Sequence, residues 1–236
     1  NALSSSLNVT VFKNSKKYSQ KYSKGKVKTK IKIEKCKKNE KGTEIIFFPD
    51  ESIFETTKFS PKKLYDFIKM KAVLVSGTSI DFKIDKELIT DSTPSYERFH
   101  FKNGIADYLD IKNKNSAKLF DKQFSIIKNI NDNEKCEIFI SFNQNEKSSL
   151  ISFCNTIETP DGGSHENGFK SGILKAIKLY GQKNQVSKIS NININDLTDY
   201  SDIVISIFIN EPSFEGQTKK RIIMPKLQKQ LETIIQ

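Results

Sequence analysis

Apolar and polar residues alternate along the first fifty positions in a way that predicts β-strands. Leu7–Phe12 and Lys26–Ile33 alternate with a period of two, and Gly42–Phe48 is a third apolar run that ends at Pro49. In the second run valine, threonine and isoleucine face one way and lysine the other, which predicts a half-buried strand with a basic outer face. Asn14-Ser15 lies between two such runs and predicts a hairpin turn.

Helical periodicity appears in three later segments. Ser60-Pro61 is a typical helix start, with the serine as N-cap and the proline at the first helical position. Ser164 is expected to cap a second helix that Gly181 ends, and Pro225 begins a third. The stretch 111–133, rich in Asn, Lys and Asp, is expected to be another helix.

Strand-like segments are interleaved with these helices, at 72–84, 98–101, 136–142, 148–155 and 203–209. Strands mixed with helices predict an α+β or α/β fold rather than a repeat protein. The change of character over residues 51–60, just before the helix start at Ser60-Pro61, predicts a domain boundary near there.

The net charge of +11 is concentrated in one segment. Lys13–Lys41 holds 13 lysines against Glu34 and Glu40, while the rest of the chain is balanced. Such a segment is compatible with a DNA-facing surface and equally with a solvated sheet face. Arginine, the better bidentate phosphate ligand, occurs only at positions 98 and 221.

Other classes of protein receive little support. The sequence has no apolar run of about 18 residues, so no membrane span is expected. Three widely spaced cysteines are typical of reduced thiols in a cytoplasmic protein. The beginning and the end both interrupt a pattern, so we expect that the chain was cut at each end.

Glu211–Lys219 reads Glu-Pro-Ser-Phe-Glu-Gly-Gln-Thr-Lys and follows an apolar run that predicts a buried strand. Pro212 and Gly216 bracket a loop. In an extended stretch the side chains of Gln217 and Lys219 would point the same way, and an amide beside an ammonium suits an anion such as a terminal phosphate. A plain surface loop is the alternative, and composition alone favours it.

Asp161–Glu166 reads Asp-Gly-Gly-Ser-His-Glu. The spacing around His165 is not that of a zinc motif, and the only other histidine is His100, so no metal site is predicted. We therefore expect His165 to be a structural residue or a domain-contact residue rather than a general base. The common phosphate-binding fingerprints, GxxxxGK[ST] and GxGxxG, are also absent.

Together these segments resemble the B subunits of the bacterial type IIA DNA topoisomerases, gyrase and topoisomerase IV. Asp161–Gly168 is similar to the family signature E/D-G-G-T/S-H-E-x-G, and Phe214–Lys219 to F-x-G-Q-T-K. Phe99–Leu109 and Gly42–Asp50 match two further stretches. The form of the Gln-Thr-Lys motif and of Lys175–Gly181 looks more like topoisomerase IV than gyrase.

The resemblance implies an α+β chain in which residues 1–55 end a GHKL ATPase α/β sandwich. Residues 56–236 would then be a transducer domain, a ribosomal-protein-like fold with a left-handed βαβ crossover. It also implies that Lys219 reaches the γ-phosphate of ATP with Gln217 beside it, and that Thr43 lies near the adenine. The general base, the Mg²⁺ ligand and the lid glycines of the family would lie before residue 1.

The family relation further implies an A-type subunit, a second B-type subunit and double-stranded DNA as partners, in the bacterial cytoplasm. A fragment of the gyrase B protein is the alternative within the class. A non-catalytic basic DNA-binding module is the alternative from another class, and a mismatch-repair GHKL ATPase is disfavoured by the two signature motifs.

Overall fold

The computed structural model describes residues 1–144 and 148–236, and these fold as two compact units, 1–63 and 64–236. The division falls eight residues after the boundary expected from the sequence, inside the first turn of a helix. Within the described residues, no helix is both long and apolar enough to span a bilayer. Cys36, Cys136 and Cys154 are free thiols.

The first unit is one antiparallel sheet. Its strands are β1 (Ser4–Lys13), β2 (Lys16–Ser23), β3 (Lys26–Val27), β4 (Lys32–Lys35) and β5 (Gly42–Pro49). The order is β3-β2-β1-β5, and β4 pairs with β2 beside β3. Asn14 and Ser15 both have positive φ, which is the backbone of a two-residue hairpin turn and confirms the turn expected there.

The single strand expected over Lys26–Ile33 is wrong. Residues 28–31 leave the ladder, and two short strands take its place. Val27 and Ile33 are also more than half exposed, so the segment has no buried side. The alternation of apolar residues and lysine in this segment reflects β-propensity, and within this unit no layer covers its apolar side chains.

The second unit is built on a five-stranded sheet of order β11-β10-β12-β9-β8. Its strands are β8 (Phe124–Asn131), β9 (Glu134–Phe142), β10 (Ser149–Cys154), β11 (Ile157–Glu158) and β12 (Ser201–Phe208). β10 and β12 are parallel neighbours, and every other pair is antiparallel. The observed fold is therefore α+β, as expected.

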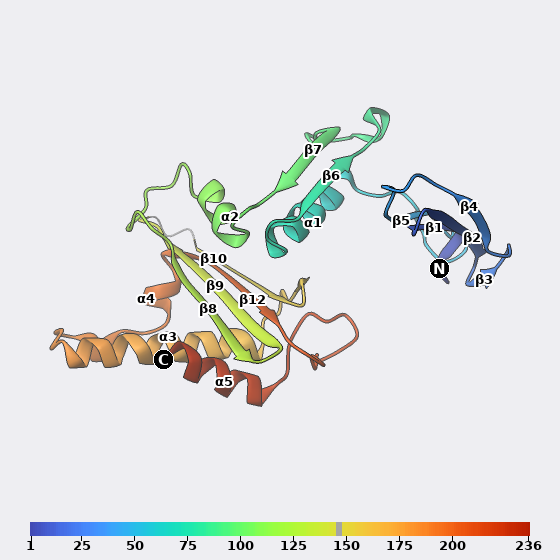
Figure 1. Cartoon of the computed structure of the whole chain (residues 1–236). Coiled ribbons are helices and arrows are strands. Elements are labelled where there is room, and N and C mark those ends of the chain that lie inside the picture. Colours follow the sequence, from blue (N-terminus) through green and yellow to red (C-terminus); the bar gives the residue numbers. More distant parts are fainter. Residues whose placement is uncertain (145–147) are drawn as a thin grey trace. The chain divides into compact units, whose positions relative to one another are not determined.

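Central strand β12 is buried on both faces because helices cover the sheet from two sides (Figure 1). Ile203, Ile205 and Ile207 point into one core, beneath α3 (Ser164–Lys183) and α5 (Pro225–Ile235). Val204, on the opposite face, packs in the second core. Three elements supply that core: α1 (Pro61–Leu74), α2 (Ile105–Lys112) and the hairpin β6 (Ser79–Lys83)–β7 (Tyr96–His100).

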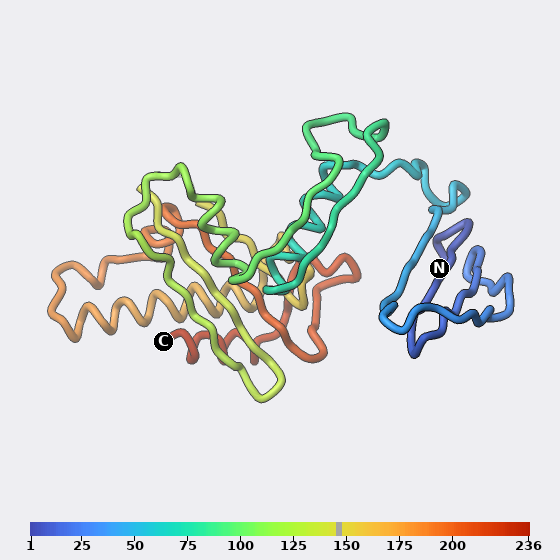
Figure 2. Tube along the Cα trace, turned by 45° about the horizontal axis from the view of Figure 1, so that its top comes forward, coloured from blue at the N-terminus to red at the C-terminus, as the bar shows by residue number. Residues whose placement is uncertain are grey.

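Short elements complete the second unit: η1 (Lys86–Leu88), η2 (Ile189–Asn191) and α4 (Asn195–Thr198). The Cα trace shows α3 and α5 side by side along the sheet (Figure 2). The N-cap expected for α1 is present, since the Lys63 amide donates to Ser60 Oγ at 3.4 Å. Gly181 does not end α3, which continues to Lys183. The glycine instead leaves room for Ile189, since a Cβ added to Gly181 would lie 2.1 Å from Cγ1 of Ile189.

Two expectations in this unit are wrong. The strand expected over 72–84 is helical to Leu74, and only Ser79–Lys83 is extended. Of the helix expected over 111–133, only residues 111 and 112 are helical, as the end of α2, and a loop and β8 follow. Ile126 and Ile130, the residues of β8 that pack on the core, are four apart, and that spacing fits one face of a helix or of a strand. Pairing with β9 decides in favour of the strand.

Gly168 and Gly172 allow α5 to lie against α3 at backbone distance. An added Cβ at Gly168 would lie 2.7 Å from Gln228 O, and one at Gly172 would lie 2.9 Å from Glu232 O. We expect Gly168→Ala to destabilise the chain by about 1–3 kcal/mol through overpacking, although alanine is the better helix former. Urea unfolding measures this change.

Asn167→Ala is the matched control, since Asn167 is exposed on the same helix. It should be neutral or slightly stabilising. Equal stability of the two variants would contradict the close approach of α5.

Candidate functional site: a loop fixed beside a glycine turn

The Gln-Thr-Lys motif lies at the tip of a loop that leaves β12. Phe214 and Ile222 face each other across this loop, and its two sides are joined by the hydrogen bonds Glu215 N–H to Arg221 O and Ile223 N–H to Ser213 O, each 3.0 Å. Residues 213–223 therefore form a narrow, hairpin-like projection, called the 213–223 loop below.

Gln217 and Lys219 are both exposed at the tip. The extended backbone expected there is wrong: the Lys219 amide donates to Gly216 O at 3.1 Å, which closes a turn, and Lys219 has φ of 57°. The hydrogen bonds at the base hold the two sides of the loop together, so the chain must reverse between them. The Lys219 ammonium lies 5.8 Å from the ring centroid of Phe214, within range of a weak cation–π contact.

The second signature motif, Asp161–Glu166, is bonded to the base of the same loop. Asp161 N–H donates to Lys220 O at 3.0 Å, Ile222 N–H to Gly162 O at 3.1 Å, and Ser164 N–H to Ile222 O at 3.0 Å. Two motifs about fifty residues apart in the sequence thus form one structural unit, which sequence reasoning did not predict from the residues themselves.

Gly163 makes this pairing possible. Its φ is 128°, and an added Cβ would lie 2.2 Å from Ile222 O and 2.6 Å from Ile222 N. Any side chain there would push the loop away from the turn. Ser164 is not the N-cap that was expected: its Oγ accepts the Met224 amide at 2.8 Å and so ties the start of α3 to the start of α5.

His165 is fully buried, as a structural residue would be. Thr159 Oγ1 donates to Ser152 O at 3.0 Å, so it accepts the proton of His165 Nε2, also at 3.0 Å. His165 Nδ1 has no hydrogen-bond partner among the described residues. Burial, with a smaller effect of Lys170, lowers the pKa of His165 to about 4, so the ring is neutral near pH 7.

Glu166 lies beside this cluster. Its carboxylate accepts Ser152 Oγ–H at 2.7 Å and forms an ion pair with Lys170 at 3.4 Å. An added Cβ on Gly162 would lie 2.7 Å from Glu166 Oε2, so this turn, too, is packed to contact. These side chains hold the turn against the sheet and α3.

Two residues at the exit of β12 were not identified from the sequence. Asn155 binds the main chain of Ile209 through its side chain, and Glu134 accepts the amide of Asn210 at 2.7 Å. The only sequence signal for Asn155 is its position in a short Asn-Thr turn between two apolar runs.

Thr43, the remaining candidate residue, belongs to the first unit. It is exposed near the start of β5 and pairs with Val11 of β1. The structure thus brings Gln217 and Lys219 together in one loop and places Thr43 on the other folded unit.

The comparisons with known proteins agree on one family. The family model described as DNA gyrase B matches residues 104–236. The chain is 40% identical over 238 residues to the B subunit of DNA topoisomerase 4 from Rickettsia felis, covering 100% of this chain and 36% of that protein. It is 35% identical over 225 residues to the B subunit of DNA gyrase from Campylobacter jejuni, covering 94% of this chain and 28% of that protein.

Solved structures show the same architecture. The 43K ATPase domain of Thermus thermophilus gyrase B, solved with an aminocoumarin, has a TM-score of 0.80 at 25% identity, covering 99% of this chain and 62% of that one. The topoisomerase IV ATP-binding domain of Francisella tularensis, solved with a small-molecule inhibitor, has a TM-score of 0.79 at 28% identity with the same coverage. The chain spans about a third of the length of the curated relatives that it matches.

The lowered pKa of His165 predicts an acid-sensitive fold. The folded pKa of about 4 lies below the unfolded value near 6.5, so the unfolded chain binds the extra proton between these values. Stability is fully present above about pH 6.5 and falls by about 3 kcal/mol as the pH drops to about 4. Urea unfolding at about pH 7 and about pH 4 measures the loss.

His165→Gln keeps a polar side chain there but cannot titrate. It should be less stable than the parent near neutral pH and should lose less stability on acidification. The same pH dependence in both proteins would show that the His165 ring does not cause the acid sensitivity.

Proposed function

Because the chain belongs to the DNA gyrase B family, we propose that it is part of the ATPase region of the B subunit of a topoisomerase IV. Identity to the topoisomerase 4 relative from Rickettsia felis is 40%, against 35% to the gyrase relative, and this difference supports topoisomerase IV. Gyrase is the alternative within the family. In this proposal residues 1–55 are the end of the GHKL ATPase domain, and 56–236 are the transducer.

The complete protein would couple ATP binding and hydrolysis to the passage of one DNA duplex through another, for relaxation and decatenation. Its partners would be an A-type subunit, a second B-type subunit and double-stranded DNA, in the bacterial cytoplasm. ATP with Mg²⁺ would be the cofactor. These are properties of a longer protein, of which this chain would supply the coupling segment.

The observation that best supports the proposal is that Lys219 and Gln217 are both exposed at the tip of a loop whose base is hydrogen-bonded. Lys219 has no ion-pair partner among residues 1–144 and 148–236, so its charge is available to an anion. Its three N–H donors and the amide suit the outermost phosphate of a nucleotide. The hydrogen bonds at the base of the loop limit the reorganisation that would be needed to bring these donors to a developing charge.

ATP supplies the phosphoanhydride bond, and Mg²⁺ neutralises part of its charge. This chain would contribute the positioning of the nucleotide. In this proposal Lys219 binds the γ-phosphate with the Gln217 amide as a second donor to it, and Thr43 of the first unit contacts the adenine. In the part of the chain that the structure describes, no group of three His, Cys, Asp or Glu side chains is arranged for a metal. We propose that the Mg²⁺ ligands lie outside this chain.

Lys219→Ala tests the proposal. In the complete protein assembled with its A-type partner and DNA, the rate of ATP hydrolysis should fall by about 100-fold or more, because a positioned donor to the transition state is lost. Steady-state phosphate release measures it. Lys220→Ala removes the same charge from the neighbouring exposed residue and should change the rate little. Equal rates for both variants would remove Lys219 from the nucleotide site.

A DNA-contacting role for the basic segment is a second candidate, favoured by the exposure of Lys26, Lys28, Lys30 and Lys32 in the first unit. Lys32 is paired with Glu34 at 2.8 Å, which reduces its net contribution. If the segment binds duplex DNA, affinity should fall steeply with salt, with a logarithmic slope of about −0.9 per phosphate neutralised.

Reversing the charge of Lys26, Lys28 and Lys30 should then weaken binding and flatten the salt dependence, as measured by fluorescence anisotropy of a labelled duplex. Reversal of Lys183, Lys226 and Lys229, exposed lysines of the second unit, is the matched control. Equal losses in both triple variants would show that net charge alone, and not this segment, attracts DNA.

A further inference from the structure

Asn155 closes the gap that opens where β10 leaves the sheet. β10 and β12 are paired in parallel up to Cys154 and Ile207, after which β10 turns into β11. The Asn155 side chain then takes the place of a strand. Its Nδ2–H donates to Ile209 O and its Oδ1 accepts Ile209 N–H, both at 2.9 Å, while its own amide donates to Ile207 O at 2.9 Å.

The opposite side of the same chain segment is held as well. The amide of Asn210 donates to Glu134 Oε1, which projects from β9. Ile209 and Asn210, the two residues that follow β12, are therefore hydrogen-bonded on both sides beyond the point where the regular ladder ends. Three residues later the 213–223 loop begins, so the direction in which the chain leaves Ile209 determines where that loop starts.

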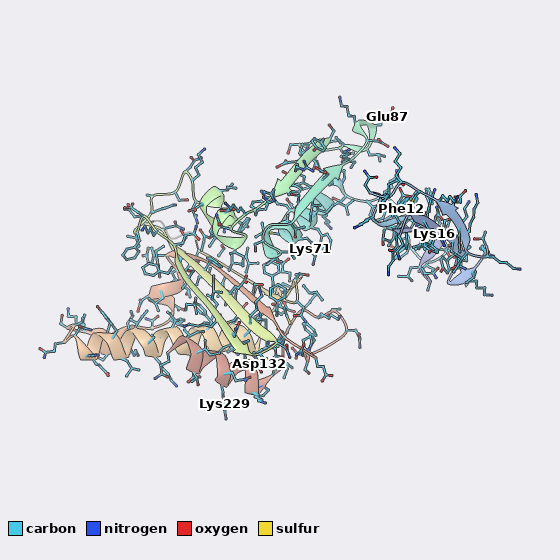
Figure 3. All side chains as sticks on the ribbon, viewed as in Figure 1. Phe12, Lys16, Lys71, Glu87, Asp132 and Lys229 are labelled. Atoms are coloured by element: carbon cyan, nitrogen blue, oxygen red, sulfur yellow. The ribbon has the colours of Figure 1, made fainter. Side chains whose placement is uncertain are left out.

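The turn that carries Asn155 is itself under constraint. Asn155 has φ of 49° and Thr156 has φ of 66°. Asparagine tolerates this left-handed region, but a β-branched residue is strained in it. Lys71 of α1, labelled in Figure 3, donates from Nζ to the carbonyl of Thr156 and to its Oγ1, the latter at 3.0 Å. Lys71 thus adds contacts from another element to a two-residue turn that the pairing of β10 with β11 also closes.

We propose that Asn155 is a positioning residue, which fixes the exit of β12 and thereby the place of Lys219 at the tip of the loop. The inference rests on the proposed function, because Lys219 is what needs to be placed. A donor must be held to within about 0.5 Å of its productive position, and a misplacement of about 1 Å can lower a rate about 100-fold.

Only an amide fits this role. Ile209 is buried, and it presents one N–H and one C=O to the same side chain. A carboxylate of the same size accepts the N–H but faces the carbonyl oxygen without a proton to donate. Asn155→Asp therefore removes one of the two bonds and replaces it with repulsion, at nearly constant volume.

The experiment uses the complete protein with its A-type partner and DNA. For Asn155→Asp we expect kcat for ATP hydrolysis to fall about 10- to 100-fold while KM for ATP changes less than about threefold. Amide hydrogen exchange should show faster exchange at Ile209, Asn210 and the 213–223 loop, with unchanged protection at Ile203–Ile207. Asn167→Asp, the same substitution at an exposed site on α3, should match the parent in both measurements.

Asn155→Gly is the second variant, since glycine accepts the positive φ and removes only the side chain. It should show the same loss of kcat and the same local exchange if Asn155→Asp is too unstable to study. A folded Asn155 variant with parental kcat and parental exchange in the 213–223 loop would overturn the inference. The exchange measurement also separates the two proposals: if Lys219→Ala proves silent, the proposed function fails, while faster loop exchange in the Asn155 variants still supports positioning.

Discussion

The contact between the main chains of Gly163 and Ile222 is the one on which the rest of the candidate site depends. No side chain separates the two segments, and the hydrogen bonds on either side of Gly163 join the Asp-Gly-Gly-Ser-His turn to the base of the 213–223 loop. The turn is itself held by the buried His165–Thr159 pair and by the start of α3. An exposed lysine at the loop tip therefore has a rigid base, which an isolated surface loop would not give it.

Much of this architecture follows from local patterns. The hairpin at Asn14-Ser15, the helix that starts at Pro61 and the buried central strand near Ile203 were each predicted from turn chemistry, capping or apolar content. These features depend on neighbours in the sequence. The strand Phe124–Asn131 was missed because only two of its apolar residues reach the core, at a spacing that fits both helix and strand.

The candidate site divides in the same way. The residue types at 217 and 219 suit an anion but favour a plain surface loop by composition alone, and only the family resemblance implied a phosphate. The turn at Lys219 was missed because it depends on the pairing of residues 213–215 with 221–223, which the residue types do not indicate. Asn155 could not be identified either, since its partner, Ile209, is 54 positions distant and is bonded through its main chain. A hydrogen bond to the main chain does not depend on which side chain that residue carries, so the sequence gives no signal for it.

The hydrogen bond from the Lys71 ammonium to Thr156 links two elements that are far apart in the sequence. The division between the two folded units falls in the first turn of α1, and Lys71, near the C-terminal end of α1, donates from Nζ to the carbonyl of Thr156. A displacement of α1 would therefore act on the turn that contains Thr156 and Asn155, and Asn155 binds the main chain of Ile209. α1 is thus connected to the main chain that leads into the 213–223 loop by a side-chain contact as well as by its packing on the sheet.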